Sequence, residues 1–206
     1  TNLACQFARE GKITTLIDHD PQASATDWLK LRSAKLPIIN GIEAVRERHR
    51  TGSTLSWRMR IHPATERVVI DTPAGLDGNG LLDLVAQSDI VIIPVIPSAI
   101  DMRAATEFIE ELRKTQAYRQ RACAIAVVAI RVKRNTLSFN SLKSFLDDLH
   151  IPFVTAFRDT QFYVKAGEHG FGVVDFDRQH PKEQEEWQPL MIWLNKTMQE
   201  IQRNRI

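Results

Sequence analysis

The sequence predicts an α/β fold in which helices cover both faces of a doubly wound, mainly parallel sheet. The predicted strands are continuous apolar runs, such as Val68–Ile70 and Ile90–Ile93, which are typical of parallel strands buried on both faces. Segments with helical periodicity separate these strands. Because 206 residues with 43% hydrophobic content suffice for one core, we expect a single domain over residues 1–206.

The expected elements alternate along the chain. Residues 1–11 form an amphipathic helix that ends at Gly11, a residue suited to a helix C-terminus. β-Branched apolar residues predict strands, and a turn at Asp20-Pro21 separates the first strand from the next helix. The expected strands cover residues 13–17, 67–71, 89–95, 124–132 and 151–156. The further expected helices cover residues 23–32, 78–86, 102–114, 141–149 and 185–203.

Two segments differ from the regular alternation of strands and helices. Residues 36–62 give a weaker pattern, with a basic surface helix expected at residues 46–50 and a partly buried piece around Trp57 and Met59. In the last helix, apolar residues at helical spacing predict a buried stripe rather than a platform on which bases stack. The stripe comprises Trp187, Leu190, Trp193, Leu194 and Ile201.

Composition excludes several classes of protein. A formal net charge of +2 is too small to indicate a nucleic-acid binder by itself. Cys5 and Cys123 are far apart and lack the spacing of a disulfide framework or zinc site, so we expect both to fill the core. The longest apolar runs are too short to span a bilayer, and we expect no membrane segment.

Acidic residues follow two of the predicted strands. Asp18 and Asp20 follow the first strand, and Asp71 ends the second. Ligands of open parallel sheets bind outside the carboxyl ends of the strands, where carboxylates on a rigid support suit the water shell of Mg²⁺. Such aspartates also commonly cap the following helix, and the residues alone leave both interpretations open.

Three segments together resemble the ParA/MinD group of ATPases with a deviant Walker motif. Residues 18–28 look like the group's D-x-D-P-Q switch I segment, and residues 69–77 look like its Walker B strand and switch II. Residues 89–98, followed by Asp101, are similar to a strand and loop of the plasmid-partition ParA branch. The resemblance covers nearly the whole chain and implies a P-loop NTPase-like fold that binds ATP and Mg²⁺.

The resemblance also implies roles for individual residues. Asp20 would position or activate the attacking water, Asp71 would hold the water shell of Mg²⁺ together with Asp20, and Asp18 would support Asp71. The expected nucleotide contacts are the γ-phosphate sensor Thr72, Pro73, Ala74 and Gly75, the loop residues Pro97 and Ser98, and Arg131. An ordinary turn explains Pro97 and Ser98 equally well, and a solvated charge is the alternative for Arg131. Ile130 stands where relatives often place an adenine-binding asparagine, which puts base recognition in doubt.

The group's phosphate loop, K-G-G-x-G-K-T-T, does not occur in this sequence, and no other glycine belongs to a G-x-x-x-x-G-K-[ST] motif. We expect that loop immediately upstream of Thr1, so that the chain is N-terminally truncated and its first strand is missing. The chain as it stands would then not hydrolyse ATP. The alternative is an inactive interaction module of the same fold, and the upstream coding sequence would distinguish the two.

Partners are implied by the resemblance as well. We expect a nucleotide-dependent homodimer in the bacterial cytosol that binds nucleoid DNA without sequence preference and a ParB-like or cargo adaptor protein. The candidate DNA contacts are Arg158, Lys165, Lys196, Arg203 and Arg205, for each of which a merely soluble surface is the alternative. A related ligase or a nitrogenase-reductase-like protein is a third possibility, and the lack of a suitable cysteine pair disfavours the latter.

Overall fold

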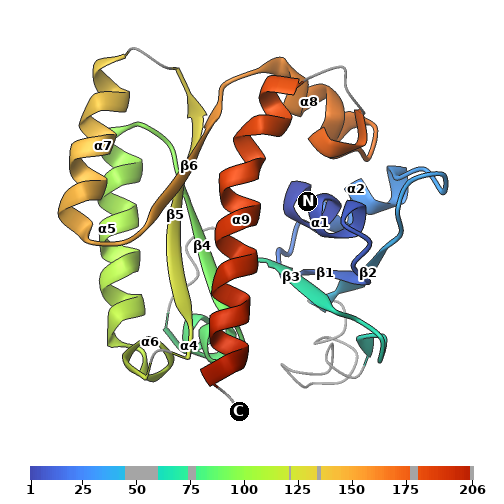
Figure 1. Cartoon of the computed structure of the whole chain (residues 1–206), viewed down its shortest axis with the longest axis horizontal. Helices are drawn as coiled ribbons and strands as arrows, with labels where there is room; N and C mark the ends of the chain where they lie inside the picture. Colours follow the sequence, from blue (N-terminus) through green and yellow to red (C-terminus); the bar gives the residue numbers. More distant parts are fainter. Residues whose placement is uncertain (45–59, 74–77, 121, 134–135, 177–180, 205–206) are drawn as a thin grey trace. The chain divides into compact units, whose positions relative to one another are not determined.

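The computed structural model describes residues 1–44, 60–73, 78–120, 122–133, 136–176 and 181–204. The chain divides into two compact units, one of residues 1–76 and 161–181 and the other of residues 77–160 and 182–206. Each unit contains its own three-stranded parallel sheet (Figure 1). The α/β class and the parallel strand pairing are therefore confirmed, whereas the single domain stays a prediction.

In the first unit, β1 (Thr14–Asp18) is the central strand. Strands β2 (Ile39–Glu43) and β3 (Arg67–Asp71) pair with it in parallel, one on each side. All five residues of β1 are buried, as the apolar pattern predicted. Within its described residues, the helices of this unit include α1 (Asn2–Arg9), α2 (Ser24–Leu31), α8 (Gln161–Glu168) and the 3-10 helix η2 (Val173–Phe176).

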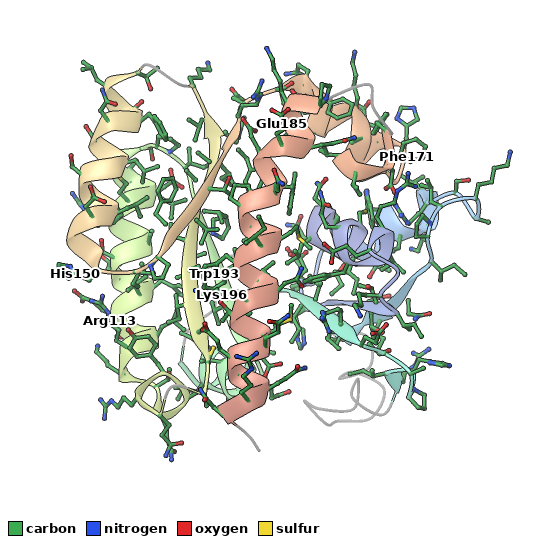
Figure 2. The ribbon with its side chains drawn as sticks, viewed as in Figure 1. Arg113, His150, Phe171, Glu185, Trp193 and Lys196 are labelled. Atoms are coloured by element: carbon green, nitrogen blue, oxygen red, sulfur yellow. The ribbon has the colours of Figure 1, made fainter. Side chains whose placement is uncertain are left out.

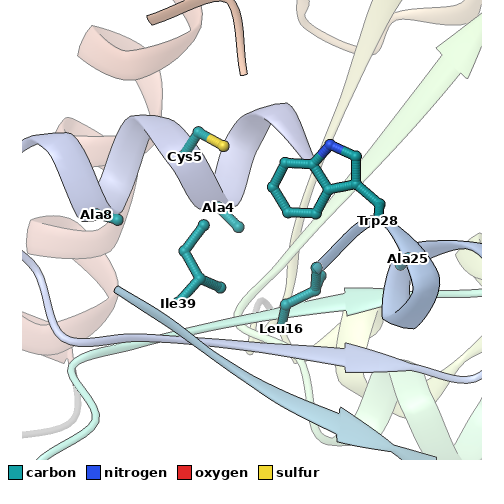
Figure 3. Close-up of a cluster of buried hydrophobic side chains, with 7 residues drawn as sticks. All are labelled: Ala4, Cys5, Ala8, Leu16, Ala25, Trp28 and Ile39. Atoms are coloured by element: carbon teal, nitrogen blue, oxygen red, sulfur yellow. The ribbon is translucent and has the colours of Figure 1, made fainter. Parts of the chain in front are cut away.

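Apolar clusters lie on both faces of this sheet. On one face Leu16 of β1 packs with Ala4 and Cys5 of α1 and with Trp28 of α2 (Figure 3). On the other face Ile17 belongs to a separate cluster. Successive residues of a strand point to opposite faces, so Asp18 projects to the same side of the sheet as Leu16, the side that α1 and α2 cover.

In the second unit, β5 (Ala124–Val132) lies between β4 (Ile90–Val95) and β6 (Phe153–Arg158), and all pairing is parallel. Helices α5 (Ala99–Lys114) and α7 (Leu137–Leu149) lie on one side of this sheet and α9 (Pro181–Asn204) on the other (Figure 1). The remaining helices are α4 (Gly78–Ala86) and α6 (Gln116–Arg119). None of the helices in the described ranges has the length and hydropathy to cross a membrane.

Several element boundaries differ from the expectations. Helix α5 begins at Ala99 and α7 at Leu137, because Ser98 and Thr136 act as N-caps and start each helix earlier. Strand β6 lies two residues later than expected. Strand β2 lies in the segment with the weak pattern, and α8 and η2 had no counterpart among the expected elements. The expected basic helix at residues 46–50, Trp57 and Met59 lie outside the described residues.

The buried stripe of α9 is narrower than expected. Trp187, Leu190 and Leu194 are buried, whereas Trp193 is half-buried and lies on the same helix as the exposed Lys196 (Figure 2). Ile201 is also half-buried. The prediction was therefore wrong in including Trp193 and Ile201, which lie toward the boundary of the apolar face.

Strands β3 and β4 are each the last strand of their sheet. Within the described residues β3 pairs only with β1, and β4 pairs only with β5. Val68 of β3 is 42% exposed although its strand is apolar. The expectation that a preceding strand is missing stays a prediction.

Candidate functional site

Asp18 and Asp71 lie next to each other at the carboxyl ends of β1 and β3. The two residues are partners in the parallel register of these strands, and neighbouring strands are about 4.8 Å apart. Strand pairing continues one step further, because the N–H of His19 donates to the carbonyl oxygen of Asp71 over 2.9 Å. The sheet of the first unit thus holds two carboxylates side by side at the carboxyl ends of its strands.

Asp20 follows in the loop between β1 and α2. Its N–H donates to Oδ1 of Asp18 over 3.0 Å, and its own Oδ1 accepts the N–H of Gln22 over 2.9 Å. The charges of Asp18 and Asp20 both act on Asp71. The catalytic and metal-binding roles of Asp20 and Asp71 stay predictions.

The two aspartates at the strand ends differ in how their carboxylates are used. Asp18 is 1% exposed, and its two oxygens accept the N–H groups of Asp20 and Thr26. Asp71 is only half-buried, and its carboxylate accepts no hydrogen bond from any residue that the structure describes. Asp71 is thus the carboxylate that is available to an added ligand.

Burial raises the pKa of Asp71, and the nearby carboxylates of Asp18 and Asp20 raise it further. Burial lowers the pKa of His19, so this imidazole is neutral at pH 7 and adds no positive charge. Within the described residues, no side-chain cation pairs with Asp71, a condition that favours binding of a metal ion.

The donors suit a cation that keeps most of its own water. Among the described residues, no group of three or more His, Cys, Asp or Glu side chains could hold a metal ion by itself. Mg²⁺ is commonly bound through one or two carboxylates, water and substrate phosphates rather than by a complete protein cage. One available carboxylate at Asp71, with Asp20 nearby, fits that mode of binding.

The remaining predicted nucleotide contacts are distributed over both units. Thr72 and Pro73 follow Asp71 directly in the first unit, while Ala74 and Gly75 lie outside the described residues. In the second unit, the hydroxyl of Ser98 accepts the N–H of Asp101 over 3.1 Å as the N-cap of α5, and Pro97 precedes it.

Arg131 interrupts the regular end of β5. It has a left-handed backbone with φ of 53° at a register shift between β5 and β6. Its 70% exposed side chain lies 3.9 Å from Asp159. Non-glycine residues in this conformation often mark functional sites, but the nucleotide roles of Pro97, Ser98 and Arg131 stay predictions.

The basic side chains predicted to contact DNA differ in their ion pairing and their exposure. Arg158 donates to Glu186 over 2.9 Å from Nε, and its backbone N–H donates to the same carboxylate over 3.0 Å. Lys165 and Arg203 are exposed on α8 and α9. Arg205 lies outside the described residues. A paired guanidinium releases fewer counterions on binding a phosphate, so Arg158 is the weakest of the candidates that the structure describes.

A buried ion pair in the first unit was not predicted from the sequence. Arg32, directly after α2, donates to Asp175 of η2 over 2.7 Å and 3.2 Å, and the two side chains are 6% and 0% exposed. The guanidinium also donates to the carbonyl oxygens of Pro37 and Gly170 and to Sγ of Cys5. Glycine-rich residues 167–172 close to Asp175 were the available signal, but they do not identify the partner.

The chain is similar in sequence or in fold to several named proteins. The chain is 24% identical over 159 residues to maintenance of carboxysome distribution protein A of Halothiobacillus neapolitanus, which covers 75% of this chain and 69% of that protein. A putative plasmid partition protein from Borrelia burgdorferi B31 bound to AMPPNP superposes with a TM-score of 0.70 at 20% identity, covering 94% of this chain and 90% of that one. An ATP complex of a McdA variant from Cyanothece gives a TM-score of 0.66 at 14% identity, covering 92% and 88%.

The family comparison agrees with the resemblance that the three motifs carry. The CobQ/CobB/MinD/ParA nucleotide binding domain matches residues 1–170, which include β1, β3 and the loop between β1 and α2. The structural similarities are below 25% identity and by themselves show the fold. With most of its length matched, this chain belongs to the CobQ/CobB/MinD/ParA nucleotide-binding domain family.

Proposed function

We propose that this chain is the ATPase part of a protein that positions a cellular cargo through nucleotide-dependent dimerisation. The observation that supports this most is the in-register pair of Asp18 and Asp71, with the charge of Asp20 acting on Asp71, in a nucleotide-binding domain of this family. Carboxylates at the end of a parallel sheet are where phosphoryl-transfer enzymes hold their cation and orient their nucleophile.

The available carboxylates suggest a division of tasks. Asp71 would bind the water shell of Mg²⁺, which when bound neutralises charge on the phosphates of ATP. Asp20 would orient the attacking water, since its Oδ2 accepts no hydrogen bond within the described ranges. Thr72, Pro73, Ala74 and Gly75 would respond to the γ-phosphate, and Pro97, Ser98 and Arg131 would contribute nucleotide contacts.

The cargo is proposed from the names of the relatives. They include proteins of carboxysome distribution and plasmid partition, which share the task of distributing a large object. We propose a cargo of that kind, an adaptor protein that connects it, and a cytosolic dimer that binds nucleoid DNA without sequence preference. Exposed Lys165 and Arg203 would supply part of the basic surface.

The test uses the full-length protein with Mg²⁺ and ATP. We expect ATP hydrolysis, and we expect Asp20→Ala to abolish it while retaining an ATP-bound dimer in analytical ultracentrifugation. Asp27→Ala is the matched control, because Asp27 is an exposed carboxylate paired with Lys30 on the same segment. DNA affinity should rise with ATP and fall steeply with salt.

Two results would contradict the proposal. Hydrolysis by Asp20→Ala at the wild-type rate would show that the water is oriented elsewhere. A full-length protein that neither binds nor hydrolyses ATP would instead support an inactive interaction module of the same fold.

A further inference from the structure

Helix α2 begins without a side chain that can cap it. Its N-cap residue is Ala23, which has a left-handed backbone with φ of 53° and no hydrogen-bonding side chain. The first N–H groups of a helix have no partner within the helix, and an N-cap oxygen normally accepts from the second or third helical residue. Thr26 is the third residue of α2.

Asp18 takes the place of the missing cap from outside the helix. Its Oδ2 accepts the N–H of Thr26 over 2.8 Å, across eight residues of sequence. Its Oδ1 accepts the N–H of Asp20 over 3.0 Å. One buried carboxylate at the end of β1 thus holds both ends of the loop of residues 19–23 and also lies at the positive end of the α2 dipole.

This arrangement determines where Asp20 lies. With its N–H fixed by Asp18, Asp20 accepts the N–H of Gln22 through Oδ1 and the N–H of Ala23 through its carbonyl oxygen, both over 2.9 Å. The loop therefore consists of consecutive turns that begin at the carboxylate of Asp18. A change at Asp18 alters the backbone of Asp20 without touching its side chain.

We propose that Asp18 is the positioning residue of the site, which fixes Asp20 and the start of α2 and does not bind the metal ion. The proposal rests on the ATPase function for its catalytic consequence. It also separates two aspartates in equivalent register: Asp71 is available to a cation, whereas the carboxylate of Asp18 is 1% exposed and already bonded at both oxygens.

The experiment compares Asp18→Asn, Asp71→Asn and the surface control Asp27→Asn in the full-length protein. The asparagine at position 18 keeps the shape but turns an NH₂ group toward one of two N–H donors. We expect kcat to fall roughly 10- to 100-fold, as for a small misplacement of a reacting group. The KM for ATP and the Mg²⁺ concentration for half-maximal rate should stay within about twofold, whereas Asp71→Asn should raise the Mg²⁺ requirement about tenfold or more.

Thr26→Pro tests the same bond from its other end. It removes the N–H that Asp18 accepts, leaves every carboxylate in place, and puts proline in the first turn of a helix, where it is tolerated. It should also lower kcat and not the Mg²⁺ affinity. If Asp18→Asn does not fold, Thr26→Pro alone tests whether the bond between Asp18 and Thr26 positions the loop.

Amide hydrogen exchange provides a readout that does not need ATP. In Asp18→Asn the amides of Asp20 and Thr26 should exchange about tenfold faster, while those of β5 should be unchanged. An increased Mg²⁺ requirement in Asp18→Asn, unchanged exchange, or an unchanged kcat in Thr26→Pro would each overturn the proposal. If the wild type hydrolyses no ATP, the proposed function fails, and exchange alone then decides whether Asp18 holds the loop.

Discussion

Replacement of Arg32 by methionine should cost the first unit about 3–5 kcal/mol of unfolding free energy, the range for breaking a buried ion pair by removing one partner. The magnitude follows from burial, because the side chain of Asp175 is 0% exposed and water cannot replace the guanidinium. After the replacement, the N–H of Gly172 at 2.8 Å and the thiol of Cys5 remain as hydrogen-bond partners of Asp175. Methionine retains most of the apolar stem, so lost packing explains little of the effect.

Denaturant titration followed by circular dichroism would measure this difference. Lys30→Met is the matched control, because Lys30 pairs with Asp27 over 2.7 Å on the same helix but both side chains are more than 60% exposed. We expect the control to cost less than about 0.5 kcal/mol. The double variant Arg32→Met with Asp175→Asn should cost clearly less than the sum of the two single variants. A loss below about 1 kcal/mol for Arg32→Met, or additive single effects, would refute the reasoning.

Three further outcomes are expected. Gly170→Ala should lower the free energy of unfolding by about 2–4 kcal/mol, because Gly170 has φ of +68° and a Cβ there would lie 2.5 Å from the backbone nitrogen of Arg32. Gly167→Ala is the control and should not destabilise, because a Cβ at Gly167 meets open space. Equal denaturation midpoints for the two variants would contradict this prediction. Asp71→Asn should raise the melting temperature at pH 7, because a raised pKa means that ionisation of Asp71 opposes folding. The gain in melting temperature should disappear as the pH falls below the ordinary Asp pKa of 3.8. A lower melting temperature of the variant at pH 7 would contradict this prediction. Burial raises the pKa of Cys5 to about 12, so a thiol reagent at pH 8 should modify it only after unfolding, and rapid labelling of the folded chain would disprove this.

The apolar pattern located most of the strands of the two parallel sheets. The expected bounds of β3 and β5, residues 67–71 and 124–132, are those of the structure. Strand β2 was missed because Asn40 and Gly41 give Ile39–Glu43 little apolar character. Its conformation depends on packing, since a Cβ at Gly41 would lie 2.7 Å from Cδ1 of Leu29. Such a requirement is not visible in the local sequence.

Helices α8 and η2 illustrate the same limit for helices. Both are short, and their positions depend on contacts with residues far away in the sequence. Asp175 bonds Arg32 across 143 residues, and the N–H of Val173 donates to Oδ1 of Asn2 over 2.9 Å. Propensity summed over eight or fewer residues is weak compared with such contacts, so the segment had no clear signal.

The candidate site could be located from the sequence, but its division of labour could not. Strand ends are local features, so Asp18 and Asp71 were both placed correctly at the carboxyl ends of their strands. What distinguishes them is the element that follows each strand. After β1, the loop brings the first turn of α2 next to the carboxylate of Asp18. Both oxygens of that carboxylate therefore accept backbone N–H groups, from Asp20 and Thr26. The sequence feature behind this bond is Ala23 at the N-cap, whose methyl group cannot accept the N–H of Thr26. A serine or aspartate at that position would accept this N–H locally and leave one oxygen of Asp18 without it.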